Sequence, residues 1–355
     1  MNFKYYLKEQ FNMHPSMTSQ DVAKMCYQAV FGAEHVLNDQ EGARLYFYDE
    51  FEQVEADDNQ PLYEPISDEV CRVNMAAWKG AGLPGEWLFK MFTETASVPG
   101  GSKEKQMEWL KEAGKMAEEG CVNLDSKQWN DFMKAYTEEG CPAVHHSEEY
   151  RLAEQPSYRI VKRQFMKLIP VLEMAAEVVK KNDTEDETCV IAIDGRAASG
   201  KSTMALQLAH ILNCDIVEMD DFFLPPGLRT PERFSEAGGN VHWERFCREV
   251  LPYLRKKGCF EYGVFDCIRM EIGTRKTINT GDYIIVEGSY SYHPRMGEYA
   301  DITVFSHVEP EEQIKRIKVR NGDEMAEMFK DRWIPLEEEY FKAYNIEEKA
   351  LIKLI

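Results

Sequence analysis

The residues best suited to chemistry form one short run, GRAASGKS, from Gly195 to Ser202. The run matches the pattern GxxxxGK[ST] at each fixed position. Glycines let such a loop point successive backbone N–H groups at phosphate oxygens, and the following helix adds its positive end. Lys201 is expected to reach the β and γ phosphates, and Ser202 to ligate Mg²⁺. The pattern predicts a nucleotide site with these contacting positions: Gly195, Ala198, Ser199, Gly200, Lys201, Ser202 and Thr203.

Carboxylates close two later strand-like runs. CDIVEMDDFF contains Asp220 and Asp221, and DYIIVEGSY contains Glu287. The carboxyl ends of parallel strands form the ligand-binding edge of an open α/β sheet, so these acids are expected near the phosphate. Asp220 or Asp221 would accept a proton from an attacking hydroxyl or hold a metal-bound water. Packing explains poorly why a carboxylate such as Glu287 stands at the end of an apolar strand. Capping of the proline-containing turn that follows is the alternative for both aspartates.

The elements that must position these residues follow from the pattern after residue 188. Short β-branched runs alternate there with helical stretches: CVIAID, CDIVEMD, DYIIVEG and DITVFSHV. This alternation is typical of a parallel sheet with crossover helices. Residues 189–355 are therefore expected to form an α/β domain, with a P-loop NTPase-type parallel sheet and flanking helices.

The first half of the chain has a different pattern. Residues 1–182 are expected to form a separate, mainly α-helical domain, because apolar residues recur there at spacings of three and four. Thr18 or Ser19 would cap a helix whose apolar face holds Val22, Met25, Cys26, Val30 and Val36. Further helices are expected over 69–79, 86–95, 103–117, 126–137 and 158–180. The charged, turn-prone residues 183–188 are expected to be the linker.

Four features of residues 189–355 together resemble the uridine kinase and phosphoribulokinase group of P-loop kinases. They are GRAASGKS, MDDFF, IIVEGSY and the arginine-bearing helix that follows. The resemblance implies transfer of a phosphoryl group from ATP with Mg²⁺ to a hydroxyl of a nucleoside (uridine-like) or sugar-like compound. It further implies that Asp220, which precedes the aromatic pair, is the catalytic base or binds the substrate hydroxyl. It also implies that Glu287 lies near the metal, where it would hold a Mg²⁺-bound water beside Ser202.

The arginine-bearing helix is EEQIKRIKVRNGDEMAEMFKDRW. Arg316 and Arg320 are four residues apart and therefore share one helical face. The resemblance implies that such arginines close over the transferred phosphoryl group and offset its growing charge. A solvated basic face is the alternative, and Lys330 and Arg332 are lesser candidates.

Two segments are expected to line the pocket of the acceptor. RTPERFSEAGGNVHWERF contains Arg229 and His242, and YGVFDCIRMEIG contains Asp266, which follows an aromatic residue as in the related kinases. The alternatives are loop closure for Gly238 and Gly239, and core packing for Trp243 and Phe265. The predicted substrate-binding residues are Asp221, Phe223, Arg229, His242, Asp266 and Tyr290.

The first half carries histidines that these kinases do not explain. AVFGAEHVL contains Glu34 and His35, and CPAVHHSEEY contains His145 and His146. They would form an anion or metal site if the fold brings them together. Otherwise they are ordinary loop residues. This half would select the acceptor, sense an effector or cover the cleft.

Composition limits the partners. A net charge of -20 and a pI of about 4.9 argue against nucleic acid, whose binders need a basic face. No uncharged apolar run approaches ~20 residues and MNFKYYLKEQ lacks a signal-peptide core, so we expect no membrane association. Nine cysteines without a CxxC pair favour a reducing cytoplasm. Self-association is possible, and a nucleotide-driven ATPase or switch is the rival to a kinase.

Overall fold

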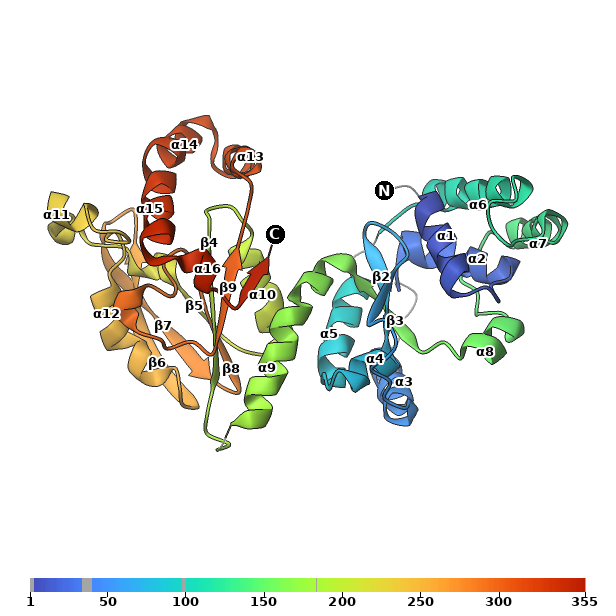
Figure 1. Ribbon diagram of the computed structural model, residues 1–355, viewed down its shortest axis with the longest axis horizontal. Coiled ribbons are helices and arrows are strands. Elements are labelled where there is room, and N and C mark those ends of the chain that lie inside the picture. Colours follow the sequence, from blue (N-terminus) through green and yellow to red (C-terminus); the bar gives the residue numbers. More distant parts are fainter. Residues whose placement is uncertain (1–2, 34–39, 98–99, 183, 355) are drawn as a thin grey trace. The chain divides into compact units, whose positions relative to one another are not determined.

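The computed structural model contains two compact units, Met1–Lys167 and Leu168–Ile355. It describes the whole chain apart from residues 1–2, 34–39, 98–99, 183 and 355. Figure 1 shows the elements of both units. Within the described residues, no helix is both long and apolar enough to span a membrane.

The N-terminal unit is mainly helical, as expected. Its core includes Val22, Met25 and Cys26, all on one face of the second helix and without exposed surface. Val36 lies outside the described residues, as do Glu34 and His35. The elements are α1 (Phe3–Met13), α2 (Ser19–Phe31), α3 (Gln40–Gln53), β1 (Tyr63–Pro65), β2 (Val70–Asn74), α4 (Met75–Gly80), α5 (Gly85–Ala96), α6 (Lys103–Glu118), α7 (Ser126–Glu138), α8 (Glu148–Glu154) and β3 (Tyr158–Lys162).

A three-stranded antiparallel sheet in this unit, β1-β2-β3, was not expected from the sequence. Cys71 of β2 lies opposite Val161 of β3 in the register. The helices predicted over 69–79 and 158–180 are therefore wrong at their N-terminal ends. VCRVN and YRIVK are short runs rich in β-branched residues, and they become strands because they pair with one another.

The C-terminal unit is built on five parallel strands in the order β10-β9-β4-β8-β5. All of β4 is buried, and helix α10 packs on β4, β5 and β8. The strands of this unit are β4 (Cys189–Gly195), β5 (Ile216–Glu218), β6 (Gly258–Asp266), β7 (Glu271–Thr280), β8 (Tyr283–Glu287), β9 (Ile302–Ser306) and β10 (Ile352–Leu354).

The helices and short turns of this unit cover the sheet and carry its functional loops. They are η2 (Arg163–Leu168, at the junction of the two units), α9 (Ile169–Lys181), α10 (Lys201–Leu212), η3 (Met219–Phe222), η4 (Pro226–Leu228), α11 (Pro231–Phe234), α12 (Trp243–Glu249), η5 (Leu251–Tyr253), η6 (Pro294–Met296), α13 (Pro310–Asn321), α14 (Asp323–Met328), the π-helical turn η7 (Phe329–Trp333), α15 (Ile334–Tyr344) and α16 (Ile346–Lys349). The predicted α/β class with a parallel sheet and flanking helices is confirmed.

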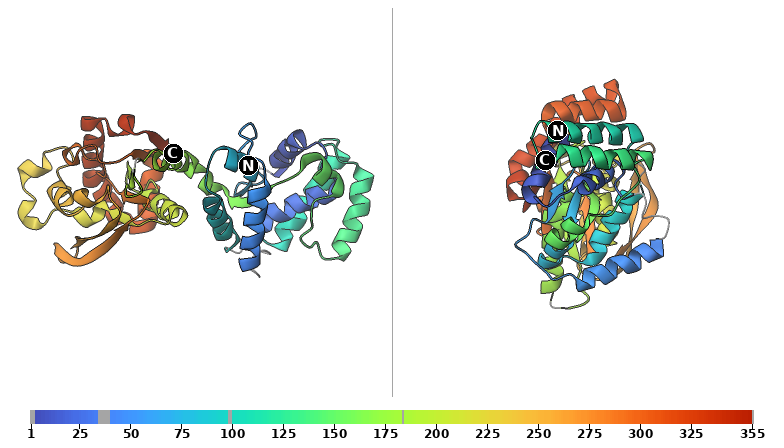
Figure 2. Two further views of the ribbon diagram at one scale, coloured as in Figure 1. Left: turned by 90° about the horizontal axis from the view of Figure 1, so that it is seen from below. Right: turned by 90° about the vertical axis from the view of Figure 1, so that its right-hand side faces the viewer.

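Two features of this unit differ from the expectation. The units separate after Lys167 rather than at residues 183–188, because α9 packs on β4 and β9 and so belongs with the sheet. Strands β6 and β7 form a separate antiparallel pair beside the main sheet (Figures 1 and 2). The sequence pattern suggested only crossover-connected strands here.

Candidate active site

The GRAASGKS run forms a loop between β4 and the first residue of α10. Gly195 passes so close to β9 that a Cβ at this position would lie 2.2 Å from the carbonyl oxygen of Ser306, so only glycine fits. Ala198 and Gly200 have positive φ angles of 57° and 102°. This left-handed backbone turns the loop so that its N–H groups gather ahead of α10, as a phosphate-binding loop requires.

Lys201 lies inside the loop rather than in solvent. Its Nζ donates hydrogen bonds to the carbonyl oxygens of Gly195 at 2.7 Å and Arg196 at 2.9 Å. The Oγ of Ser199 is buried and has no hydrogen-bond partner among the described residues. A cation and an unsatisfied hydroxyl beside turned backbone N–H groups fit the oxygens of a polyphosphate.

Carboxylates meet this loop at the ends of neighbouring strands. Glu287 ends β8 and lies opposite Ile193 of β4, which brings its Oε2 to 3.4 Å from the Oγ of Ser202. Asp220 lies in η3, directly after β5. Glu287 is buried and Asp220 is exposed, yet partial desolvation raises the pKa of both acids, and the charge of Lys201 opposes that rise.

A hydroxyl and carboxylates are the hard oxygen ligands that Mg²⁺ prefers, so the set fits this ion with phosphate and water completing its shell. No group of three or more His, Cys, Asp or Glu within the described ranges is placed to hold a metal by itself. A magnesium ion here would thus depend on the nucleotide for part of its coordination.

One cavity of about 600 Å³ joins these groups. Its polar wall consists of the phosphate loop from Ala197 to Thr203 together with Asp220, Glu287, Arg316 and Arg320. Its apolar wall includes Phe223, Val241, Met325, Met328, Phe329 and Trp333. The structure therefore places the predicted phosphate, acid and arginine groups around a single space.

The C-terminal unit has the P-loop NTPase fold. The parallel sheet and the loop between β4 and α10 establish this directly. Among solved structures, the C-terminal half resembles a possible uridine kinase from Bacillus stearothermophilus, with 18% identity, a TM-score of 0.38 and coverage of 52% of this chain and 100% of that one. It also resembles a D-glycerate 3-kinase from Cryptococcus neoformans, with 15% identity, a TM-score of 0.36 and coverage of 50% and 87%. No protein-family model and no curated protein sequence matches the chain.

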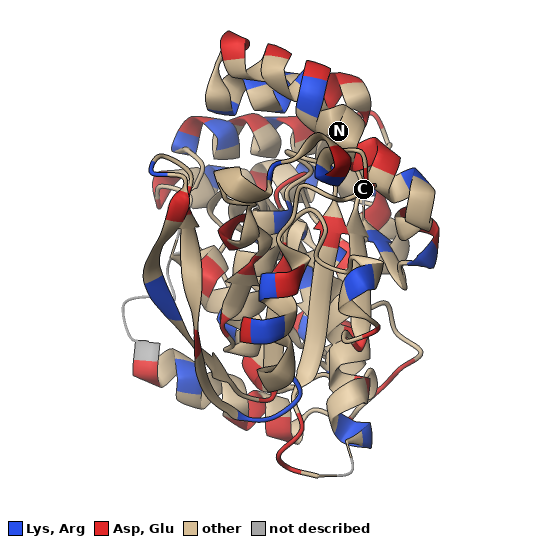
Figure 3. Ribbon diagram, turned by 90° about the vertical axis from the view of Figure 1, so that its left-hand side faces the viewer, with Lys and Arg blue, Asp and Glu red and all other residues tan. Residues whose placement is uncertain are grey.

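Both predicted arginines of α13 reach the cavity. Nη1 of Arg316 lies 3.4 Å from the carbonyl oxygen of Ala198, and the charge of Arg320 acts on Asp220. Lys330 and Arg332 do not line the cavity, and Arg332 lies against the rings of Phe234 and Trp333. Figure 3 shows Lys and Arg interspersed with Asp and Glu on the elements seen from this side.

Of the predicted acceptor residues, Phe223 and Tyr290 line the cavity. Four others do not, and three of these have structural partners. Asp221 is buried and accepts a hydrogen bond from the hydroxyl of Tyr262 at 2.7 Å. Arg229 donates to the carbonyl oxygen of Leu224 in its own loop.

The remaining two lie at the hairpin and at the start of α12. Asp266 caps the β6–β7 turn by accepting hydrogen bonds from the N–H groups of Ile268 and Arg269. His242 does not line the cavity either, and burial lowers its pKa. Cys267, the residue after Asp266, lines the cavity although the sequence analysis did not single it out.

Helix α15 contacts the phosphate loop and the strand before it in ways that the sequence did not indicate, including a pair between Glu338 and Arg196. Glu337 lines the cavity and accepts a hydrogen bond from the N–H of Ala197. The hydroxyl of Tyr340 donates to Asp194, the buried acid that precedes Gly195. Asp194 also accepts from the N–H groups of Gly195 and Tyr290. The sequence signal that could have indicated these contacts was the position of Asp194, an acid at the end of a strand directly before the motif.

The site predicted from His35, His145 and His146 stays a prediction, because only the last two of these residues are described. His146 is buried, where its Nδ1 lies 2.7 Å from Asp21 and its Nε2 lies near the hydroxyl of Tyr158. Burial lowers the pKa of His146 to about 4, so it is neutral at pH 7. His145 is exposed, and His35 lies outside the described residues.

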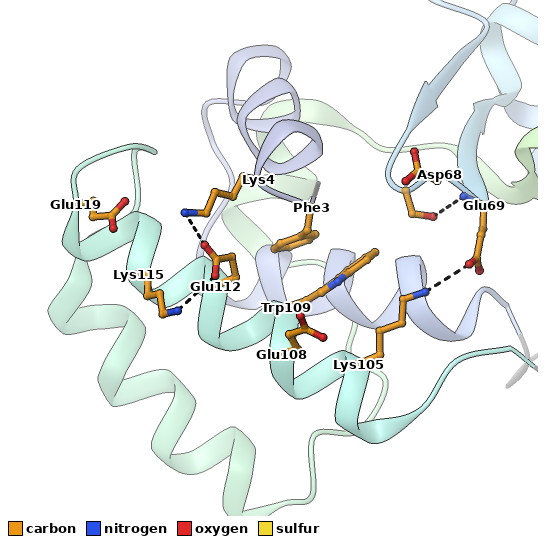
Figure 4. Close-up of a pocket in the computed structure, with 11 residues that line it drawn as sticks. Phe3, Lys4, Asp68, Glu69, Lys105, Glu108, Trp109, Glu112, Lys115 and Glu119 are labelled. Carbon is orange, nitrogen blue, oxygen red and sulfur yellow. Dashed lines mark hydrogen bonds and ion pairs between the residues drawn. The ribbon is translucent and has the colours of Figure 1, made fainter. Parts of the chain in front are cut away.

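A cavity of about 730 Å³ lies between α1, α6 and the loop before β2 (Figure 4). Its floor is the stacked pair Phe3–Trp109, with ring centroids 4.5 Å apart. Lys4 and Lys115 both pair with Glu112, and Lys105 pairs with Glu69. These charges satisfy one another across an open groove, and nothing in the geometry selects a ligand.

Proposed function

We propose that the C-terminal unit is an ATP-dependent kinase that transfers the γ-phosphoryl group to a hydroxyl of a nucleoside (uridine-like) or sugar-like acceptor. The observation that carries this proposal is the single cavity shared by Lys201, Asp220 and Arg320. A phosphate-binding loop, a carboxylate that can accept a proton and an arginine beside the phosphates are the parts that phosphoryl transfer to a hydroxyl needs.

The phosphate loop and Lys201 would bind the β and γ phosphates of ATP. Ser202 and Glu287 would hold Mg²⁺, which neutralises phosphate charge when it is bound. Arg316 and Arg320 would lie beside the transferred group and offset the charge that develops on it. Each of these side chains lines the cavity, and Lys201 and Arg316 would exchange their present partners, the loop carbonyl oxygens and Glu312, for phosphate oxygens.

Asp220 would accept the proton of the attacking hydroxyl. Asp220 is accessible to solvent, but desolvation by the surrounding protein raises its pKa, and a raised pKa makes the carboxylate a better proton acceptor. The apolar wall formed by Phe223, Phe329 and Trp333 gives an acceptor a surface on which its less polar part can pack. We place this activity in the cytoplasm, where the nine cysteines, which form no disulfide, would remain reduced.

The test is a product assay with purified protein, Mg²⁺ and ATP against uridine, cytidine, other nucleosides, pantothenate, glycerate and pentose phosphates. We expect one acceptor to yield a phosphorylated product by mass, with no product from Lys201→Ala. Asp220→Asn should lower turnover by about 10²- to 10⁴-fold while ATP still binds. Asp221→Asn is the matched control and should keep turnover, because an amide oxygen can still accept from Tyr262.

Two results would contradict the kinase proposal. ADP release at the same rate in every well, including the one without acceptor, would indicate an ATPase or switch instead. ATP binding without release of ADP in any well would indicate a nucleotide-binding unit without turnover. Equal loss of activity in the Asp220 and Asp221 variants would remove Asp220 from the chemistry.

A further inference from the structure

The sheet of the N-terminal unit carries an arginine that is buried without an ion pair. Arg72 of β2 exposes only 2% of its surface. Its Nε and Nη2 donate to the side-chain oxygen of Gln28 at 3.2 and 2.9 Å, and its Nη1 donates to that of Gln10 at 2.8 Å. Among the described residues, no carboxylate oxygen lies within the 4.0 Å ion-pair distance of its guanidinium. Amide oxygens satisfy N–H groups but bring no opposite charge into contact, and a buried charge without a contacting counter-charge is costly. Glu64 interacts with the charge of Arg72 without forming an ion pair with it.

The surroundings of Arg72 fix its guanidinium in place. The guanidinium carbon lies 4.7 Å from the centre of the Tyr158 ring. The two glutamines are themselves oriented, because Gln28 donates to the hydroxyl of Tyr158 and Gln10 donates to Glu64. A rigid, fully bonded support around one charged group is what a binding site requires, because little conformational entropy is then lost when a ligand binds.

Arg72 lies on the wall of a cavity of about 990 Å³. Tyr150 and Tyr158 form aromatic parts of that wall. The N-terminal unit therefore offers the positive charge of Arg72 to a space large enough for a small molecule. This space is separate from the groove of Figure 4, with which it shares no lining residue.

The same wall is acidic away from Arg72. It includes Glu55, Asp57, Glu64 and Glu154. His14 lies between two of these acids, with its Nε2 2.9 Å from Glu64 and its Nδ1 3.1 Å from Glu154. Burial disfavours its charge, but the two carboxylates raise the pKa of His14 above its usual value. Among the described residues, both hydrogen bonds that Glu64 accepts end on Oε2, which leaves its Oε1 for a ligand.

We propose that this cavity binds a small zwitterion, with a carboxylate on Arg72 and an ammonium group at Glu64. A single carboxylate matches the two remaining N–H directions of a planar guanidinium. The four acids on the wall disfavour a phosphate dianion and favour a ligand that also carries a positive charge. The proposal concerns the N-terminal unit alone and stands or falls independently of the kinase proposal.

The test is calorimetric titration of the full chain with glycine, β-alanine and γ-aminobutyrate, which differ in the distance between carboxylate and ammonium. Acetate and inorganic phosphate are anionic probes without an ammonium group, and ethanolamine is a probe without a carboxylate. We expect at least one of the three amino acids to bind more tightly than acetate, ethanolamine and phosphate. Gln28→Glu should lower the affinity for that amino acid at least tenfold, because the new carboxylate neutralises Arg72 while the side chain keeps nearly the same shape. Gln128→Glu, on the exposed side of α7, is the matched control and should leave binding unchanged.

Two further measurements separate a lost site from a misfolded chain. Gln28→Glu should unfold cooperatively and at a higher temperature than the wild type without ligand, because Arg72 gains a partner. Glu64→Gln should weaken binding of the amino acids and leave acetate binding unchanged. Absence of binding by every probe, or equal affinity in the wild type and Gln28→Glu, would overturn the site. Acetate binding as tightly as the amino acids would overturn the zwitterion assignment.

Discussion

The carboxylate of Glu337 accepts a hydrogen bond from the backbone N–H of Ala197, with 3.0 Å between Oε2 and the nitrogen. Its other oxygen accepts from the hydroxyl of Ser289 at 2.7 Å. Glu337 is buried, and Ala197 belongs to the phosphate loop, 140 positions earlier in the chain. Helix α15 therefore holds the loop from outside, and the conformation of the loop depends on this helix.

Removing this support should weaken nucleotide binding. Glu337→Ala leaves the N–H of Ala197 without its acceptor in a buried place, which costs about 1–3 kcal/mol. We expect the Kd for ATP, measured by equilibrium titration, to rise about tenfold. Glu337→Gln keeps an acceptor for Ala197 and should stay within about threefold of the wild type. Equal weakening in both variants would show that the negative charge near Lys201, rather than the hydrogen bond, is what matters.

The two arginines of α13 should affect turnover more than binding. Arg316→Ala and Arg320→Ala each remove a positive charge from the cavity wall. Because negative charge develops on the transferred phosphoryl group, we expect kcat to fall by about 10²-fold while KM for ATP changes little. Lys318→Ala is the control on the same helix, because Lys318 pairs with Asp323 and does not line the cavity. A similar loss in all three variants would indicate a general effect of positive charge on the helix.

Arg245 should be important for the stability of the C-terminal unit. It has no exposed surface, and it donates to the carbonyl oxygens of Gly263 and Asp221, which joins the Asp220 loop to β6. Arg245→Met leaves both oxygens unpaired, and we expect the free energy of unfolding in urea to fall by roughly 3 kcal/mol.

Arg248→Met is the matched control for that experiment. Arg248 is exposed and pairs with the same acid, Glu249, as Arg245 does. An exposed pair contributes about 0–1 kcal/mol, so this variant should unfold close to the wild type. Equal destabilisation of the two variants would indicate that the ion pair, rather than the buried hydrogen bonds, stabilises the unit.

The sequence predicted those parts of the site that depend on local order. Lys201 and Ser202 follow from a contiguous motif. Glu287 was predicted from its resemblance to a strand-end acid of related kinases, and its place at the end of β8 brings it to the same edge of the sheet. Arg316 and Arg320 follow from helical spacing. In each case the backbone alone directs the side chain toward the cavity.

The sequence could not predict contacts that depend on distant segments. Asp220 and Asp221 are adjacent acids, and only the packing of Tyr262 from β6 shows that Asp221 belongs to the core. Asp266 matched a pattern of related kinases, but the tight β6–β7 turn uses its carboxylate as a cap. Glu337 follows the motif by more than a hundred residues, and its partner in the loop is a backbone N–H that no residue type reveals.

Asp194 should make the stability of the C-terminal unit depend on pH. Burial raises its pKa from 3.8 to about 6, although three hydrogen bonds favour its charged form. Between pH ~4 and ~6 the folded protein therefore holds a proton that the unfolded chain has released. The stability that Asp194 contributes is complete below the pKa that it has in the unfolded chain. This contribution is lost as the pH rises to the pKa that Asp194 has in the folded protein.

The variant Asp194→Asn has no carboxylate to titrate and should lack this component of the pH dependence. A change in pKa of about two corresponds to roughly 3 kcal/mol of free energy. The difference in unfolding free energy between the wild type and Asp194→Asn should therefore change by about this amount between pH ~4 and ~6.5. The variant should be the relatively more stable protein at the higher pH. Urea unfolding at several pH values measures this difference. Asp186→Asn, an exposed position in the same unit, should show no such trend. A constant difference between wild type and Asp194→Asn across the window would mean that the three hydrogen bonds keep Asp194 charged at both ends, because they then outweigh the cost of burial.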